Sequence, residues 1–571
     1  MAQREYEAFD LTDVAAKGLN YVTSMTDEAN DFLPYWYVGI HVAPAFARHV
    51  RVDDAELVAS WYEAVVALQK ILGRDERAQA AQAGFRKHLL DCWGPAGLRY
   101  HRDYPWSNTN HASFHEMGWV LAGLNRLCLE EPDNDQARQR AEGLVKGLRA
   151  LAIQRKIKTF WSGDFPIPET VLEFPADLYL RDGGFVPERC TGRGEESIRN
   201  AVLLEPLTTR AIAFGDDVAL ELAEGLANHM LGLSRYFNWN GEFFGHVHSA
   251  LWFAIGLLKL GRHMQRAHYV EKAWQIFRYV RSLGSEFGWV PEYAQWFAPG
   301  ETHCETCCIK DMIEFALTAA EMGYDTWDLI VKYTRNQLSE QQIKDGSFVA
   351  VDRDRPDDPR KGHTWKDLDR RVVGGWSGGA EPNSLSLARF RSIAGCCVGT
   401  APVGLWLVWE KIVERKADGV FVHMPFDRET EEVRVEVGYP NRGLMRVAVK
   451  QPNDVFVRAY PWMGPHPALR VNGRPAPVVQ AQGCFVFAGA QAGDVLEVEH
   501  PLQDRESEET VAGRALRLVW RGPDVVRMDP PGLPLRLYQR EKGVEKERPA
   551  PPAMAGGGAA PAVRMQPTDR K

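Results

Sequence analysis

The sequence predicts a mainly α-helical protein that carries a β-sandwich module toward its C-terminus. From about residue 12 to about residue 415, apolar residues recur at helical spacing between long, aromatic-rich loops. The helices come in pairs without an exact short repeat, which favours a helical toroid over a solenoid. Near residue 418 the apolar period changes to two, which indicates strands.

The helical part is clearest at "IKDMIEFALTAAEMG" (309–323). Its apolar residues follow the spacing of a buried helix face, and Gly323 is the expected C-terminal stop. The segments "AEGLANHMLGLSRYF" (223–237) and "HSALWFAIGLLKLG" (248–261) show the same pattern. We therefore expect helices at all three places.

The β-sandwich is predicted from segments such as "EEVRVEVG", "MRVAVKQ" and "GDVLEVEHPL", in which apolar and polar residues alternate. The Asn-Gly pair in "VNGRP" (471–475) signals a hairpin turn. The final stretch is rich in Pro, Gly and Ala and should be disordered. The predicted division is a helical-barrel domain at 1–415, a β-sandwich domain at 416–540 and a disordered tail at 541–571.

Composition narrows the class of function. The chain has 571 residues, of which 45% are hydrophobic and 25% charged, so it can bury at least one large core. The formal net charge is −8 and there is no basic stripe. Nucleic acid is therefore not expected as a partner.

The ends and the apolar runs bear on location. The N-terminus "MAQREYEAFDLTD" is charged and lacks an apolar core, so we expect no secretory signal. The apolar run "ALWFAIGLL" (250–258) is far shorter than the roughly 20 residues of a membrane span. These features predict a soluble, cytoplasmic protein without a membrane partner. Thiols stay reduced in that compartment, so clustered cysteines point to metal binding or catalysis before disulfides.

Five of the nine cysteines lie in two short stretches, "GETHCETCCIKDM" (300–312) and "IAGCCVGTAPVG" (393–404). One carboxylate and three thiolates from these stretches could hold a tetrahedral Zn²⁺: Glu305, Cys307, Cys396 and Cys397. A metal favours the deprotonated thiol, and a thiolate that faces a pocket is a competent nucleophile. Two other interpretations also fit. The cysteines could be small buried hydrophobes, or Cys304 could replace Glu305 in a closed structural site of four thiolates.

The motifs, in this order, resemble glycoside hydrolase family 127, the β-L-arabinofuranosidase family. The family's Glu-Thr-Cys appears as Glu305-Thr306-Cys307, and its paired cysteines appear as Cys396-Cys397. The segments "VERKADGVFVHMPF" and "YPWMGPHPALRVNGRPAP" resemble the strand into the family's sandwich and its C-terminal module. "GHVHSALWFAIGLLKLG" (245–261) resembles a helix that brings a histidine into the sugar pocket. The similarity covers roughly residues 90 to 500.

The resemblance implies an (α/α)₆ barrel with a C-terminal β-sandwich module, and a retaining glycoside hydrolase that acts on a β-L-arabinofuranosyl or related terminal sugar. It implies a zinc ion held by Glu305, Cys307, Cys396 and Cys397. Cys396 would be the nucleophile, Glu292 in "GWVPEYAQWF" the acid/base residue, and His246 the sugar-contacting histidine. A retaining enzyme needs a nucleophile on one face of the anomeric carbon and an acid/base group near the leaving oxygen. A thiolate would here replace the usual second carboxylate.

The chain departs from the family pattern at two places. The family usually has Pro-Pro-Asn after its cysteine pair, where this chain has Val398-Gly399-Thr400. Where the family often has "GHLIEAA", with a histidine that faces the sugar, this chain has "GWVLAGL" (118–124), which puts Trp119 there. Both departures bear on which sugar is bound.

Other candidate pocket residues precede an apparent helix in "DYPWSNTNHASFHEMGW" (103–119). Polar and aromatic groups of this kind suit a sugar: Trp106, Asn108, His111, His115 and Glu116. We predict His111, His115 and Trp119 as substrate-binding residues, and the alternative is a loop with capping residues and a core tryptophan. Glu205, in the apolar "LLEPL" (203–207), is either a pocket acceptor or half of an internal ion pair.

Three functions are compatible with these observations. The first is the zinc-dependent hydrolase with a carbohydrate substrate, and a homodimer is left open as its assembly. The second is a non-hydrolytic protein that binds carbohydrate or protein and keeps zinc as a structural ion. The third is an epimerase or lyase without metal, with histidines as its acid/base pair. A Cys396 sulfur that is open and within roughly 5 Å of Glu292 favours catalysis, whereas a sealed four-thiolate site with Cys304 favours structure.

Overall fold

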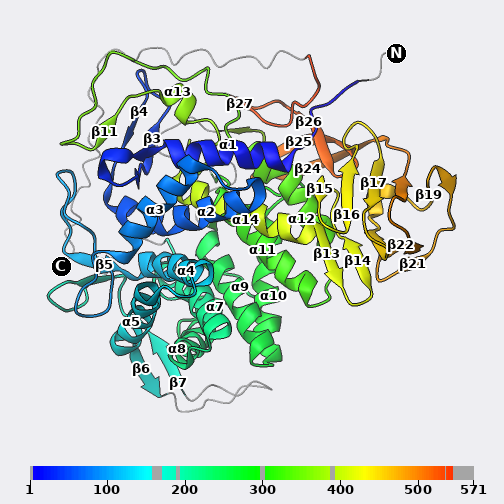
Figure 1. The fold of residues 1–571 in the computed structure, drawn as a ribbon. Coiled ribbons are helices and arrows are strands. Elements are labelled where there is room, and N and C mark those ends of the chain that lie inside the picture. The colour runs from blue at the N-terminus through cyan, green and yellow to red at the C-terminus, as the bar shows by residue number, and fades with distance from the viewer. Residues whose placement is uncertain are drawn as a thin grey trace.

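The computed structural model describes residues 4–156, 170–187, 193–295, 302–385, 392–533 and 535–543. It is rich in helix up to residue 412 and rich in strand after it, as the change of period predicts (Figure 1). The helical elements fill the blue-to-green part of the ribbon, and the strands of the last third gather at one end of the molecule.

The long helices follow one another along the first three quarters of the chain. They are α1 (Leu11–Ser24), α2 (Glu56–Leu72), α3 (Glu76–Leu90), α4 (Phe114–Glu130), α5 (Asp135–Leu151), α7 (Leu204–Phe214), α8 (Asp217–Asn228), α9 (Val247–His263), α10 (Ala267–Leu283), α11 (Thr306–Glu321), α12 (Trp327–Tyr333) and α14 (Gly395–Ile412). Two shorter helices, α6 (Glu195–Arg199) and α13 (Leu368–Arg371), lie in the connections.

Six of these helices form a closed series of contacts. Helix α2 contacts α4, α4 contacts α7, α7 contacts α9, α9 contacts α11, α11 contacts α14, and α14 contacts α2. Each also contacts a helix that is its neighbour along the chain or, for α14, the first helix α1. The helices therefore form two sets that alternate along the chain. One set forms a closed ring of contacts, and each helix of the other set packs against a member of that ring.

The three segments singled out from the sequence are helical. Helix α11 ends at Glu321, and Gly323 then adopts a left-handed φ of 93°, a conformation that glycine takes at low cost. Helix α9 spans its predicted segment. Helix α8 continues as a π-helical turn over His229–Leu233, so the helical conformation ends before the predicted residue 237. Arg235 has a φ of 54°, which a right-handed helix cannot accommodate.

The strands after α14 form two larger sheets and one smaller sheet. The five-stranded sheet has the order β13 (Val413–Lys416), β14 (Gly419–Val422), β18 (Asn453–Arg458), β22 (Cys484–Ala490) and β21 (Gln480–Ala481). The six-stranded sheet has the order β15 (Arg428–Glu429), β16 (Val433–Val437), β17 (Leu444–Val449), β23 (Val495–Glu499), β19 (Ala468–Val471) and β20 (Arg474–Pro475). The smaller sheet joins β24 (Asp504–Val511), β25 (Arg514–Arg521) and β26 (Asp524–Asp529).

The predicted hairpin at the Asn-Gly pair is present. Strands β19 and β20 pair antiparallel, with Val471 opposite Arg474. The two residues between them, Asn472 and Gly473, have φ values of 54° and 74°. Two consecutive residues with positive φ are what a tight hairpin turn of this kind requires. The face-to-face packing of a β-sandwich stays a prediction, as do the domain boundaries.

Both ends of the described chain are tied to the strand-rich part. Tyr6 donates its backbone N–H to the Asn441 side chain and forms a bridge with Glu541. Short strands β12 (Ser384–Leu385) and β27 (Leu535–Arg536) pair antiparallel and join the end of the chain to the helical part. Of the tail predicted at 541–571, residues 541–543 are described and Glu541 forms the bridge with Tyr6, while 544–571 lie outside the described residues.

Within the residues that the structure describes, none of the helices has the length and apolarity to cross a bilayer.

Candidate metal centre

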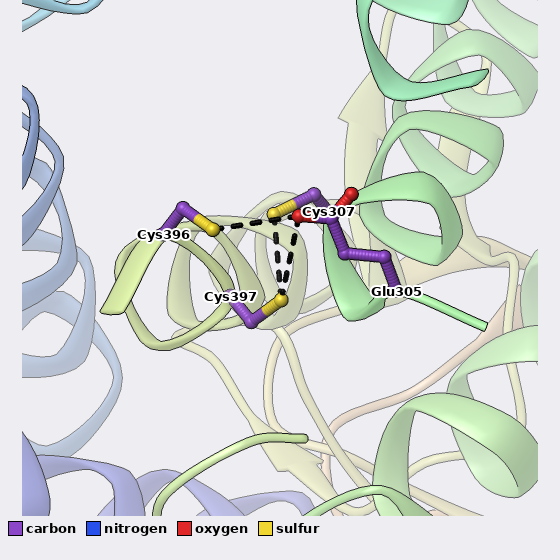
Figure 2. A group of neighbouring side chains, drawn as sticks. All are labelled: Glu305, Cys307, Cys396 and Cys397. Atoms are coloured by element: carbon purple, nitrogen blue, oxygen red, sulfur yellow. Dashed lines mark hydrogen bonds between the residues drawn. The ribbon is translucent and has the colours of Figure 1, made fainter. Parts of the chain in front are cut away.

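Two helix N-termini bring the predicted metal ligands together. Glu305 caps the N-terminus of α11 and Cys307 lies in its first turn, while Cys396 and Cys397 lie in the first turn of α14. Helices α11 and α14 contact each other, so their N-terminal turns converge on one point. The N-terminus of a helix favours negative charge, and it lowers the cost of a thiolate there. Figure 2 shows the three sulfur atoms and the Glu305 carboxylate pointing toward one another.

The spacing of the four donor groups fits a tetrahedral site. The Cys307 and Cys397 sulfurs are 3.6 Å apart, and Oε1 of Glu305 is 3.4 Å from the Cys396 sulfur and 3.8 Å from the Cys397 sulfur. All four donor atoms lie within 4.8 Å of one another. Zinc–sulfur bonds of about 2.3 Å and zinc–oxygen bonds of about 2.0 Å at tetrahedral angles separate two sulfurs by about 3.8 Å, and a sulfur and an oxygen by about 3.5 Å. The donor set and its dimensions therefore fit a divalent zinc ion.

The extra cysteines of the first stretch are not part of this group. Cys304 is fully buried, and its sulfur contacts Oε1 of Gln341 at 3.6 Å. Its backbone forms a bridge with Ala380. Cys308 is fully buried as well. The cluster among the described residues thus contains Glu305, and not the four thiolates of the structural-site interpretation.

Burial and hydrogen bonds between the thiols determine the pKa values in the cluster. Burial raises the pKa of the Cys307 thiol well above its ordinary value. Burial acts in the same direction on Cys397, but hydrogen bonds from the thiols of Cys307 and Cys396 outweigh it and lower the pKa of Cys397. The hydrogen bond of Cys307 lowers the pKa of Cys396, but the hydrogen bond of Cys397 and burial outweigh it and raise that pKa well above its ordinary value. The protein alone therefore favours the thiolate at Cys397. A bound metal ion would favour deprotonation of the other two thiols.

A short two-stranded sheet places the predicted acid/base residue beside the cluster. Strand β9 (Gly245–His246) pairs antiparallel with β10 (Tyr293–Ala294), with His246 opposite Tyr293. Glu292 immediately precedes β10, and its carbonyl accepts the backbone N–H of Val247 at 2.9 Å. Side-chain atoms of His246, Glu292 and Glu305 lie within 4.8 Å of one another. Glu305 is therefore shared by the cysteine group and by the Glu292 group.

His246 is held on both sides of its ring. Nδ1 lies 2.7 Å from the Ser249 hydroxyl, and Nε2 lies 3.2 Å from Oε2 of Glu305. Burial raises the pKa of Glu305, but the hydrogen bond and charge of His246 and the charge of His248 outweigh it and lower that pKa. His246 therefore orients the Glu305 carboxylate and keeps it ionised.

His248 is a site residue that the sequence interpretation missed. It lies two residues after His246, in the first turn of α9, and is 2% exposed. Its Nδ1 is hydrogen-bonded to the Asp311 carboxylate on α11. Burial lowers the pKa of His248, but the charge and hydrogen bond of Asp311 outweigh it and raise that pKa above its ordinary value. The only available signal was the second histidine of "GHVHSA".

Trp119 and His248 share one aromatic stack. The Trp119 ring lies 5.4 Å from the His248 ring at an interplanar angle of 29°, and 4.6 Å from the ring of Trp252. Trp119 is 3% exposed. Trp119 stands where the family often has a histidine, and in this structure it packs against another histidine, His248.

His115 reaches the same region from the start of α4. Its Nε2 lies 3.7 Å from Oε2 of Glu56, the first residue of α2. Burial, followed by the charges of His246 and His248, lowers the pKa of His115 to about 4. Burial, followed by the charges of Glu116 and Glu305, raises the pKa of Glu56 well above its ordinary range. Burial therefore disfavours the charged form of both groups, and Glu56 is a second residue that the sequence interpretation missed.

The other candidates of the 103–119 segment lie in a neighbouring polar group. Glu116 is 1% exposed and is paired with Arg51 and with Nε2 of His101. The His111 ring lies 6.4 Å from the His101 ring, and its pKa is lowered first by burial and then by the Arg51 charge. Trp106 stacks on His49 and Tyr104, and Asn108 is exposed.

Two further residues are placed by their contacts. Glu205 accepts a hydrogen bond from Lys259 at 2.7 Å, which agrees with the ion-pair interpretation. Thr400, in the Val-Gly-Thr segment that departs from the family pattern, has its hydroxyl 3.4 Å from the Cys307 sulfur. The same hydroxyl lies 3.1 Å from the Cys396 carbonyl oxygen. The Thr400 hydroxyl therefore links the N-terminal turns of α11 and α14.

Comparison with known proteins bears on the fold. No family model and no curated protein matches the sequence. Among solved structures, the chain is similar to a GH127 β-arabinofuranosidase, with 14% identity, a TM-score of 0.58 and coverage of 90% of this chain and 81% of that chain. A GH127 β-L-arabinofuranosidase from Geobacillus stearothermophilus T6 matches with 13% identity, a TM-score of 0.55 and coverage of 90% and 80%. A glycoside hydrolase matches with 12% identity, a TM-score of 0.57 and coverage of 88% and 84%.

These similarities extend over nearly the whole chain, and their low identity makes them a statement about fold. The chain has the fold of the glycoside hydrolase family 127 structures. The resemblance that the motifs indicate is thereby confirmed at the level of the fold.

Proposed function

We propose that the protein is a zinc-dependent retaining glycoside hydrolase that uses Cys396 as its nucleophile and Glu292 as its acid/base residue. The substrate class is a terminal β-L-arabinofuranosyl or related sugar, by analogy with the GH127 enzymes of similar fold. Zn²⁺ would be held by Glu305, Cys307, Cys396 and Cys397. When bound, it would keep the thiols ionised and in position.

The observation that carries this proposal is the arrangement of four donors at zinc-site spacing beside a carboxylate that is not a donor. A purely structural thiolate site is closed on all sides. Here Cys396 is 8% exposed, whereas Cys307 and Cys397 are fully buried. Of the three cluster cysteines, Cys396 alone keeps some solvent exposure, which supports it as the residue that a substrate reaches. Glu292 and Glu305 approach within 4.8 Å, which supports a carboxyl group close to that sulfur.

In the first half-reaction, the Cys396 thiolate attacks the anomeric carbon. The protonated Glu292 carboxyl donates its proton to the leaving oxygen as the glycosidic bond breaks. This gives an alcohol and a sugar joined to Cys396 through a carbon–sulfur bond. In the second half-reaction, the Glu292 carboxylate takes a proton from water, which attacks the same carbon and releases the Cys396 thiolate. Two displacements return the sugar with its original anomeric configuration.

We infer that the ring of contacts from α2 through α14 is the inner wall of an (α/α)₆ barrel. The helices that pair with it, α1, α3, α5, α8, α10 and α12, would form the outer wall. The cysteines then lie where two inner helices begin, at one mouth of the barrel. The start of α4, which carries His115, and the segment before β10, which carries Glu292, would line the sugar site at the same mouth.

The first test joins metal content to activity. Metal analysis of the purified protein should give about one zinc per chain, and nitrophenyl furanosides and pyranosides should identify an accepted glycoside. Cys396→Ala should abolish turnover of it, because no other sulfur of the cluster is accessible. Cys484→Ala, which changes a buried cysteine of β22 outside the cluster, is the matched control and should keep full turnover.

The second test isolates the role of Glu292. Glu292→Gln should slow the hydrolysis of glycosides with poor leaving groups far more than that of nitrophenyl glycosides, because a good leaving group needs little protonation.

Full activity of Cys396→Ala would exclude the cysteine mechanism. Zinc at one per chain without turnover of any glycoside, together with unfolding on metal removal, would favour the non-hydrolytic binding protein.

A further inference from the structure

One histidine beside the candidate centre has a ring nitrogen that is not used. The two nitrogens of His246 are taken up by Ser249 and Glu305. In His248, Nδ1 is taken up by Asp311, and Nε2 is buried without a hydrogen-bond partner among the described residues. A buried polar atom of this kind costs free energy unless something binds it. Like His115, whose Nδ1 also has no hydrogen-bond partner among the described residues, His248 can therefore bind a ligand through a buried ring nitrogen.

The His248 ring is fixed from behind by a chain of buried charges. Asp311 accepts from His248 on one oxygen and from Lys310 on the other, at 3.3 Å for the lysine. Lys310 also pairs with Glu314 at 2.6 Å, and Glu314 pairs with Lys259 at 2.8 Å. A side chain whose neighbours are themselves held keeps one orientation, which is what a ligand contact requires.

The His248 ring lies beside a tryptophan pair and beside His246, which contacts the candidate centre. Trp252 stacks on the imidazole at 5.6 Å and 19°, and Trp119 stacks at 5.4 Å and 29°. The His246 ring lies 5.7 Å away and nearly perpendicular. Glu305 and His115 are the other charged or titratable groups that act on His248 from this side. His248 thus lies next to His246, and its charge acts on the Glu305 carboxylate of the candidate centre.

We propose that His248 is a substrate-contacting residue whose Nε2 binds a hydroxyl group of the sugar that reacts at Cys396. The inference deepens the proposed function and rests on it for the identity of the reacting atom. A hydroxyl group both donates and accepts, so it satisfies Nε2 whether or not that atom carries a proton. The stacked Trp119 ring, on α4, keeps the imidazole in one orientation. The contact with the sugar would then come from α9, which carries His248.

The test uses two variants of His248, each of which keeps a polar group near the position of only one of the two imidazole nitrogens. His248→Asn keeps an amide near the position of Nδ1, where it still meets Asp311, but removes the group at Nε2. His248→Gln keeps a polar group near the position of Nε2. His263→Asn, at the exposed end of the same helix, is the matched control and should not change activity.

The measurement is kcat/KM on the accepted nitrophenyl glycoside and on each of its monodeoxy analogues, with zinc content measured on every variant. We expect His248→Asn to lower kcat/KM by about 10- to 100-fold on the parent glycoside, and by little on the one analogue that lacks the bound hydroxyl. His248→Gln should retain more activity than His248→Asn. All variants should keep the zinc content of the unchanged protein.

An equal loss on the parent and on every deoxy analogue would overturn the inference, because the histidine would then act only through the fold. If the protein hydrolyses no glycoside, the proposed function fails and a binding measurement decides about His248. Tryptophan fluorescence reports on the stack, and L-arabinose, D-xylose, D-galactose and L-rhamnose are the probes. A change with one sugar that His248→Asn abolishes and His263→Asn keeps would support the contact. No change with any of the four sugars would refute it.

Discussion

At the scale of single residues, three cysteines of the first stretch have different surroundings although they are close in sequence. Cys307 shares the cluster with Cys397, which is 90 residues away, whereas Cys304 contacts Gln341. The difference arises because Glu305 is the N-cap of α11. Residues before the cap follow the loop, and residues after it turn by about 100° each around the helix axis.

This difference gives a prediction about metal content. Cys307→Ser should lose most of the bound zinc after dialysis, because a hydroxyl group is a much weaker ligand than a thiolate. Cys304→Ser and Cys308→Ser should keep about one zinc per chain. Elemental analysis of the three variants decides the matter, and loss of zinc from Cys304→Ser would return the site to the four-thiolate interpretation.

A second residue-scale prediction concerns the dependence of stability on pH. Burial raises the pKa of Glu116, but the charge and hydrogen bond of His101 and the charge of Arg51 outweigh it and lower the pKa to about 2 from 4.5. The folded state therefore gains stability, about 3 kcal/mol, that is complete well above pH 4.5 and is lost as the pH falls from 4.5 toward 2. Glu116→Gln lacks this gain.

Urea unfolding at pH 6, 4 and 3 measures the effect. The stability difference between the unchanged protein and Glu116→Gln should be largest at pH 6 and shrink at each lower pH. Glu142→Gln, at a half-exposed ion pair, should show a small difference that does not depend on pH in this way. A Glu116→Gln difference that stays constant from pH 6 to pH 3 would contradict the assignment.

At the scale of elements, the cysteine pair depends on how closely α14 lies against α2. A Cβ atom added to Gly399 would lie 2.4 Å from the Ser60 hydroxyl oxygen and 2.6 Å from its Cβ. Gly399 follows the cysteine pair by two residues, in the segment that departs from the family pattern. The glycine thus allows a close approach of two helices that positions the metal ligands.

We predict that Gly399→Ala destabilises the protein by about 1–3 kcal/mol and weakens zinc binding, since the helix must move away from α2. Gly404→Ala, in the same helix, meets Lys310 at 3.2 Å, a much less severe approach than the one at Gly399, and should cost less stability. Thermal unfolding and zinc titration with a competing chelator measure both effects. Removal of the obstacle in the double variant Gly399→Ala/Ser60→Gly should restore part of the zinc affinity.

At the scale of the whole molecule, the strand-rich part is joined to the helices by a buried ionic group. Arg335, which follows α12, donates to both carboxylate oxygens of Asp524 on β26 at 3.0 and 2.9 Å. Both residues are 0% exposed in their side chains. Arg540 donates to the same carboxylate and to Glu340, so the end of the chain joins the group.

Removal of one partner should leave a buried charge without compensation. Asp524→Ala should therefore destabilise the protein by about 3–5 kcal/mol and make the junction sensitive to limited proteolysis. Arg517→Ala on the adjacent strand β25 breaks an exposed, solvent-screened pair with Glu506 and should have little effect on stability. Similar unfolding midpoints for the two variants would show that the junction does not depend on this group.

Much of the element order could be predicted from the sequence, because it follows from local periodicity. The helix at 309–323, the change of period near 418 and the Asn-Gly hairpin all depend on residues close in the chain. The segment 223–237 was predicted less well, since a residue with positive φ ended the helical conformation early. A pattern of apolar spacing carries no information about a single backbone angle.

The sequence by itself determined the kinds of donor group at the centre. Glu-Thr-Cys and Cys-Cys are local motifs, and their resemblance to motifs of one family indicates that they form one site. The tertiary structure alone decided which neighbours complete the site. The pairing of His248 with Asp311, the Glu56 carboxyl beside His115 and the Thr400 hydroxyl on the Cys307 sulfur each join different helices. Spacing along one helix determines the face on which a side chain lies, but what it meets there depends on the helix packed against that face.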